Sequence, residues 1–100
     1  MNMLVLLSYD TPDTKHQTLL RTEFLRMGGQ RVQYSLYLFA GEPHECDRVI
    51  RYMRRVGTGI PGDIRLLPMD EGTWNRQLVI SEVDEAARKI REISRCVLIW

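Results

Sequence analysis

The sequence has few cysteines and no long hydrophobic run. Only Cys46 and Cys96 occur in the 100 residues, too few for a disulfide framework, and they form no CxxC metal motif. The longest apolar runs, residues 3–7 and 97–100, are far shorter than the ~20 residues that cross a bilayer. No basic region of a signal peptide precedes the first run. We therefore expect a cytoplasmic protein with reduced thiols and no membrane partner.

The sequence also has almost no net charge. Fourteen basic and thirteen acidic residues leave a net charge of +1, so any site for a polyanion has to be local. With only two histidines, His16 and His44, and no paired cysteines, a zinc site is not expected. The glycine-rich residues 57–62 lack the Lys-Ser/Thr ending of a P-loop and are expected to be a connecting loop.

The length and the hydrophobic content of 44% are those of one globular domain. Residues 3–10 begin with a continuous apolar run, which predicts a strand covered on both faces. Thr11 and Pro12 predict the N-cap and first position of a helix that ends at Gly28-Gly29. Residues 31–40 alternate in polarity and predict one long second strand.

The second half of the chain continues the alternation of strands and helices. An apolar stripe at helical spacing follows Glu42-Pro43 and predicts a second amphipathic helix. The later predictions are a third strand over 63–69, a turn over 70–72, a fourth strand over 77–80, a helix from Ser81 and a possible strand over 96–100. The fold class is therefore α+β, with a ferredoxin-like βαββαβ-type core over residues 1–80, built as an antiparallel sheet with two helices on one face. Residues 81–100 add a helix and a short strand that we expect to contribute to a dimer.

Two helices on one face leave the other face of the sheet uncovered. Tyr37 and Phe39 fall on the opposite side of the second strand from Val32 and Leu36, so we expect these two aromatic residues on the uncovered face. Soluble monomers rarely expose a large apolar patch, and pairing two copies about a two-fold axis would cover it. The alternative is a monomer covered by its own last helix.

Asp10 is the first candidate for chemistry, because it ends an apolar strand just before a helix start. A carboxylate in this place can bind Mg²⁺. Two copies about a two-fold axis would supply two carboxylates, on which hydrolysis of a phosphodiester by metal-activated water could be built. Alternatively, Asp10 caps the following helix or turn. Arg31, Gln33 and Ser35 form a polar row that either contacts phosphate or forms the rim of a dimer contact.

Arginines cluster on the predicted second helix of this nearly neutral chain. They are candidates for contacts with a nucleic-acid backbone, although a solvated helix face has the same pattern; the four are Arg48, Arg51, Arg54 and Arg55.

Two segments resemble one known family. Residues 4–13, LVLLSYDTPD, are similar to the opening of the CRISPR-associated protein 2 family, and residues 29–37, GQRVQYSLY, to its second-strand signature. The likeness continues more weakly over residues 63–69. The resemblance implies a ferredoxin-like homodimer, an integrase partner in spacer acquisition, and a Mg²⁺ ion bound by Asp10 near the dimer axis. It also implies a site made of Tyr9, Asp10, Arg31 and Ser35.

Three functions stay open at this point. The first is a Mg²⁺-dependent endonuclease on RNA or double-stranded DNA, in which Arg31 steadies a phosphate. The second is a non-catalytic dimer that bridges integrase subunits on DNA, with the arginine helix along the backbone. The third is a regulatory module for a small molecule or an RNA-recognition platform. The first two strands lack the paired exposed aromatics of an RNA-recognition motif, and no glycine-bearing loop follows the first strand to receive a ligand.

Overall fold

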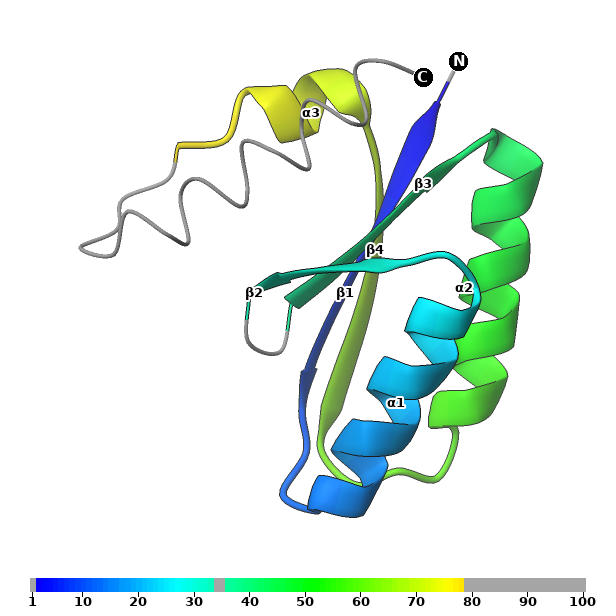
Figure 1. Cartoon of the computed structure of the whole chain (residues 1–100), viewed down its shortest axis with the longest axis vertical. Helices are drawn as coiled ribbons and strands as arrows, with labels where there is room; N and C mark the ends of the chain where they lie inside the picture. Colours follow the sequence, from blue (N-terminus) through cyan, green and yellow to red (C-terminus); the bar gives the residue numbers. More distant parts are fainter. Residues whose placement is uncertain (1, 34–35, 79–100) are drawn as a thin grey trace.

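Four strands form one antiparallel sheet in the order β2-β3-β1-β4, in a computed structural model that describes residues 2–33 and 36–78 (Figure 1). The elements are β1 (Met3–Asp10), α1 (Thr14–Arg26), β2 (Gln30–Gln33), β3 (Leu36–Gly41), α2 (Pro43–Gly57), β4 (Asp63–Asp70) and α3 (Glu71–Asn75). This βαββαβ order, with two long helices on one face, confirms the predicted ferredoxin-like core. The helix and strand predicted within residues 81–100 lie outside the described residues.

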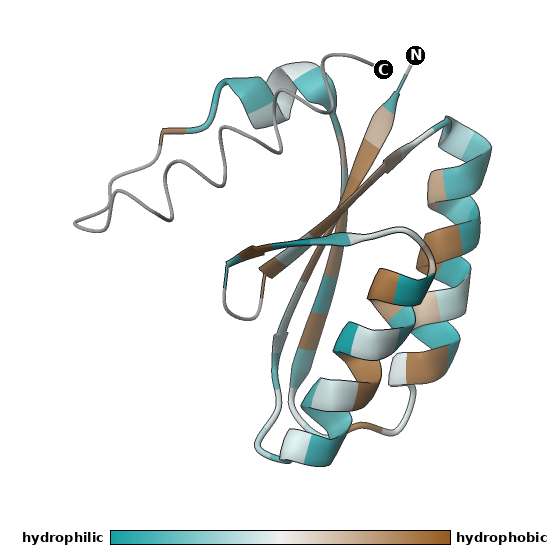
Figure 2. Cartoon of the chain, viewed as in Figure 1, coloured by the Kyte–Doolittle hydropathy of each residue, from teal (hydrophilic) through white to brown (hydrophobic). Residues whose placement is uncertain are grey.

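Helices α1 and α2 cover one face of the sheet and enclose the larger core. Val5 and Leu7 of β1 are fully buried against side chains of both helices, among them Phe24 and Met53. Figure 2 shows the same arrangement as hydrophobic colour on the strands and hydrophilic colour on the outer sides of the helices. The strand β1 begins with a continuous apolar run because its alternate side chains pack on opposite faces of the sheet: Val5 and Leu7 face the helices, and Leu4 and Leu6 face the other side.

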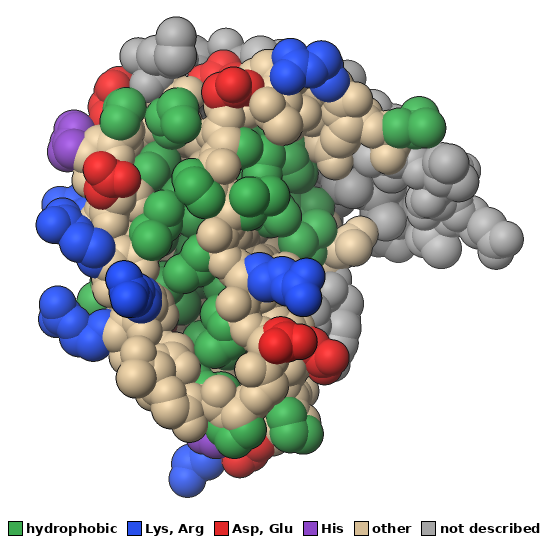
Figure 3. All heavy atoms as spheres, turned by 180° about the vertical axis from the view of Figure 1, so that it is seen from behind, with side chains coloured by type: hydrophobic (Ala, Val, Ile, Leu, Met, Phe, Trp, Pro, Cys, Tyr) green, Lys and Arg blue, Asp and Glu red, His purple; other side chains and the backbone are tan. Residues whose placement is uncertain are grey.

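The opposite face of the sheet is apolar too, and the described residues cover it only in part. At one end Trp74 of α3 packs with the buried side chains of Leu4, Val32 and Leu38. Toward the middle Leu67, which lies opposite Leu6 in the β1–β4 register, is 52% exposed. Figure 3 shows hydrophobic side chains gathered over this face, with charged side chains around them. We call it the open face.

The expected position of two aromatic residues was wrong. Tyr37 and Phe39 are buried under the helices, at 1% and 7% exposure, and do not lie on the open face. The alternation itself was read correctly, since Leu36 and Leu38 belong to the other cluster. Alternation says which residues share a face, but not which face the helices cover. The open face is apolar because it carries Val32, Leu36 and Leu38, which we had expected under the helices.

The single strand predicted over residues 31–40 was also wrong. The structure has two strands here, β2 and β3, which run antiparallel with Arg31 opposite Tyr37 and a bulge between Arg31 and Gln33. Residues 34–35, which lie between the strands and outside the described ranges, are Tyr-Ser and carry no glycine or proline. Because the polarity pattern runs through the connection, and serine favours turns only weakly, the sequence gives no strong local signal for the reversal.

The start of α1 differs from the prediction by two residues. Asp13, and not Thr11, is the N-cap, because its carboxylate accepts a hydrogen bond from the Lys15 backbone N–H at 2.9 Å. The predicted start of α2 is confirmed, with Pro43 in the first turn. Here the Glu45 carboxylate accepts a hydrogen bond from the backbone N–H of the N-cap residue, Glu42, at 2.9 Å.

The turn predicted over residues 70–72 is replaced by a short helix. Asp70 caps α3 by accepting a hydrogen bond from the Thr73 backbone N–H at 2.6 Å, which also holds the pKa of Asp70 below its usual value. Gln77 and Leu78 are not in a strand, and residues 79–80 lie outside the described chain. The helix forms because this cap and the burial of Trp74 on the open face act together.

Candidate functional site

Asp10 is exposed at the last position of β1, directly opposite Asp63 at the first position of β4. Opposite residues of an antiparallel pair share a face, and their Cβ atoms are about 5 Å apart. Within the described residues, neither carboxylate forms an ion pair or a side-chain hydrogen bond. Like charges placed opposite one another disfavour the pairing of strands, so this pair is a natural position for a cation.

Ser8 and Arg65 form the next opposite pair on the same face. Together with Tyr9, these residues and the two carboxylates line a hollow of about 230 Å³. The hollow is too small for most drug-sized ligands but large enough for a phosphate group and a hydrated cation.

Gly62 holds the end of β1 against the loop that precedes β4. Its φ of +106° lies in the left-handed region, and a Cβ atom there would stand 2.2 Å from the Asp10 carbonyl oxygen. Only glycine satisfies both conditions. The loop therefore fixes the backbone of Asp10 by close contact, which supports a defined geometry in the hollow.

Tyr9 contributes to the lining of the hollow, but its ring lies on the other side of the sheet, in the core under the helices. Its ring is buried and stacks on Tyr37, with ring centroids 6.0 Å apart. Burial, reinforced by a side-chain hydrogen bond with Tyr37, raises the pKa of Tyr9 to about 12, although Arg21 and Arg31 oppose that rise. Tyr9 therefore stays protonated at any physiological pH. Its buried ring, stacked on Tyr37, suits a structural role in positioning nearby side chains.

The four residues implied by the family resemblance are not gathered in one cluster. Arg31 is exposed on β2, opposite Tyr37, and its charge acts on Tyr9. Asp10 is on the other face of the sheet from Tyr9 by strand alternation, and β3 separates β1 from β2. Ser35 lies outside the described residues. Within one chain, the structure brings Arg31 and Tyr9 together and separates them from the Asp10 carboxylate.

The arginines of α2 form an exposed basic face. All four are exposed. Three of them fall on the side of the helix opposite Cys46, Val49 and Met53, and Arg54 lies at the border of the buried side. In the described ranges none of them is in an ion pair, so their charges are available to a partner. We call this set the α2 basic face; its members are Arg48, Arg51, Arg54 and Arg55.

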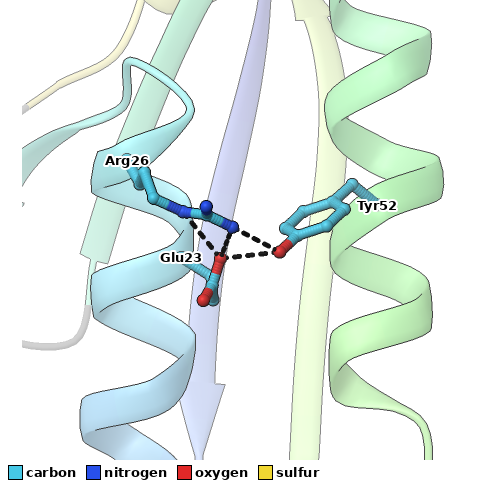
Figure 4. Close-up of polar contacts among 3 residues, drawn as sticks. All are labelled: Glu23, Arg26 and Tyr52. Carbon is cyan, nitrogen blue, oxygen red and sulfur yellow. Dashed lines mark hydrogen bonds and ion pairs between the residues drawn. The ribbon is translucent and has the colours of Figure 1, made fainter.

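Another arginine, Arg26 of α1, is already engaged. Figure 4 shows it beside Glu23, which it contacts through two guanidinium nitrogens, and beside Tyr52 of α2. The Tyr52 hydroxyl donates to the Glu23 carboxylate at 2.7 Å and, together with Arg26, lowers the pKa of Glu23. This cluster ties α1 to α2 and is structural.

The carboxylates fit a magnesium ion only in part. Among residues 2–33 and 36–78 no group of three His, Cys, Asp or Glu side chains could hold a metal. Mg²⁺, however, is often bound by one or two carboxylates, with waters and substrate phosphates completing its shell. Asp10 and Asp63 supply that number within one chain.

Sequence reasoning missed Asp63 and Arg65. The signal was present, because an antiparallel pairing of residues 3–10 with 63–70 puts Asp10 opposite Asp63 and Ser8 opposite Arg65. Finding it required knowledge that β1 and β4 are neighbours with this register, which no local pattern in either strand provides.

The comparison with protein families agrees with this fold. None of the curated proteins is significantly similar to the chain in sequence. In the described part of the chain, no helix has both the length and the apolar content needed to cross a membrane. The family described as CRISPR associated protein Cas2 matches residues 3–77. The chain therefore belongs to the Cas2 family and is a CRISPR-associated protein of spacer acquisition.

Proposed function

We propose that the protein is a homodimer that binds nucleic acid in the cytoplasm and hydrolyses phosphodiester bonds with Mg²⁺ at Asp10. One observation carries the proposal. The Asp10 carboxylate is exposed opposite Asp63, without a partner among the described residues, in a hollow that also contains an arginine. Anionic ligands can hold a metal ion that activates water, and an arginine beside them can contact the phosphate.

The homodimer is supported by the open face. Leu6 and Leu67 lie opposite one another at its middle, between the Trp74 cluster at one end and the polar hollow at the other. A second copy seated on this face would bury the apolar middle. The hollow would then lie at the polar rim of the interface, which is where interfaces stay accessible to solvent.

Each residue has a role that follows from its position. Asp10, with Asp63, would hold the Mg²⁺, which when bound activates a water and offsets the negative charge of the phosphate. Tyr9 is a positioning residue, held by Tyr37 beside Arg31. Arg31 contacts a backbone phosphate from β2. Ser35 is assigned to the site by the family resemblance alone.

A second function is favoured by the α2 basic face. Four exposed arginines on one helix suit a sequence-independent grip on the DNA backbone, and that grip needs no metal. On this alternative the dimer bridges integrase subunits on DNA without cutting it. The absence of a three-ligand metal group in the described residues is compatible with it.

The Asp10→Asn variant separates the two functions. With Mg²⁺ present, the endonuclease proposal predicts that wild-type protein cleaves RNA or duplex DNA and that the variant has only background activity. Asp47→Asn, which removes an exposed carboxylate from α2, serves as the matched control and should cleave normally. Wild-type protein that cleaves nothing, yet supports integration together with its integrase, would contradict the endonuclease and favour the scaffold.

Salt titration tests the α2 basic face. The logarithm of the nucleic-acid affinity should fall linearly with the logarithm of the salt concentration, and replacing Arg48 and Arg51 by glutamine should reduce that slope by about two. An affinity that does not change with salt would exclude backbone contacts by this helix.

A further inference from the structure

We propose that Arg65 of β4 binds the phosphate on which Asp10 acts, so that the reacting group lies against the β1–β4 pair of a single chain. This inference rests on the function proposed above and adds its phosphate contact. The substrate class is a phosphodiester of RNA or DNA that is bound through its backbone, without base readout.

The register of β1 and β4 places the necessary groups. Arg65 is opposite Ser8, and the next pair on the same face is Asp10 opposite Asp63. Successive residues on one face of a strand are about 7 Å apart, which is within reach of an arginine side chain. One phosphate group can therefore contact both the guanidinium and a cation held by the carboxylates.

The charges of the hollow support the same assignment. Arg65 is exposed and forms no ion pair or side-chain hydrogen bond within the described ranges, as is also true of the two carboxylates. The unliganded hollow thus has two negative groups and one positive group. A divalent cation held by the two carboxylates would change the net charge of the hollow from −1 to +1, which would favour the binding of an anionic phosphate. Arginine is suited to this contact because its planar fork of donors matches phosphate oxygens.

Arg31 cannot fill this role within the same chain. It lies on β2, two strands from β1, and its neighbours are Tyr9 and Tyr37 on the helix-covered face. Arg65 is one strand from β1 and shares the face of Asp10. The two arginines would thus contact different phosphates, and only that of Arg65 is the reacting one.

The test compares Arg65→Gln, Arg65→Lys and the control Arg76→Gln, which removes an exposed arginine directly after α3 that does not line the hollow. The probes are a single-stranded RNA and a DNA duplex. For each variant we would measure Mg²⁺-dependent cleavage, the salt dependence of binding, and the mass in solution. Arg65→Gln should lower kcat/KM about ten- to a hundredfold and reduce the salt slope by about one, equally for all sequences. Arg65→Lys should recover the salt slope and part of the rate, and Arg76→Gln should behave as wild type.

Two results would overturn the inference while the proposed function stands. The first is normal cleavage and binding by Arg65→Gln when Asp10→Asn is inactive. The second is a monomeric Arg65→Gln, because Arg65 would then serve the contact between subunits. If wild-type protein neither binds nor cleaves either probe, the proposed function fails and the role of Arg65 fails with it.

Discussion

The two faces of the sheet are both apolar, yet they differ in what covers them and in what they carry. Beneath α1 and α2, buried side chains such as Leu7, Phe24 and Met53 are excluded from solvent by the chain itself. On the open face α3 is the one described helix that gives cover, and it covers one end, while Leu67 is 52% exposed. Asp10, Asp63 and Arg65, the charged residues of the hollow, lie on this second face. The difference teaches that the helix-covered face stabilises the fold, whereas the open face is the surface on which we propose that a second copy binds.

The largest effect expected from this comparison is on the helix-covered face. Phe24→Ala removes a fully buried ring and should lower the free energy of unfolding by about 3–5 kcal/mol. Leu25→Ala, its neighbour on α1, is the control and should change stability by no more than about 0.5 kcal/mol because Leu25 is 41% exposed. Denaturant unfolding followed by circular dichroism measures both. Equal losses for the two variants would contradict the assignment of the core.

The next largest effect is expected in the loop before β4, which contacts the backbone of Asp10. Gly62 has a left-handed φ and lies close to the Asp10 carbonyl oxygen. Gly62→Ala should therefore lower the free energy of unfolding by about 2–4 kcal/mol. Gly59→Ala is a matched control from the same loop, because Gly59 has a φ of +89° but no atom within 4 Å of an added Cβ. This variant should lower the free energy of unfolding by about 1–2 kcal/mol. Thermal unfolding compares them. A Gly62→Ala variant no less stable than Gly59→Ala would show that the loop does not hold Asp10.

The smallest effect is the alkaline behaviour of Tyr9. Its pKa rises from 10.0 to about 12 on folding, so the folded state keeps a proton that the unfolded state loses. Stability from this group is therefore complete below pH 10 and is lost as the pH rises toward 12. Tyr9→Phe should remove this part of the pH dependence. The same loss of stability between pH 10 and 12 in the variant would assign it to another group.

Much of the fold follows from local patterns, and the differences have specific physical causes. Glu42-Pro43 and the apolar stripe of α2 define that helix because capping and periodicity act over a few residues. The reversal between β2 and β3 has no strong turn residue to mark it, and the assignment of Tyr37 to a face requires knowledge of which side the helices cover. The candidate site was predictable as far as Asp10. Asp63 and Arg65 enter it only through the β1–β4 register, a contact between segments more than 50 residues apart.

The central claim is that a second copy covers the open face, and the mass in solution tests it most directly. Sedimentation at micromolar concentration should give about twice the chain mass of 11.7 kDa for wild-type protein. Leu67→Glu should give the single mass, while Leu25→Glu, which adds the same charge to α1, should remain a dimer. Wild-type protein that sediments as a monomer, or a Leu67→Glu variant that stays dimeric, would contradict the account.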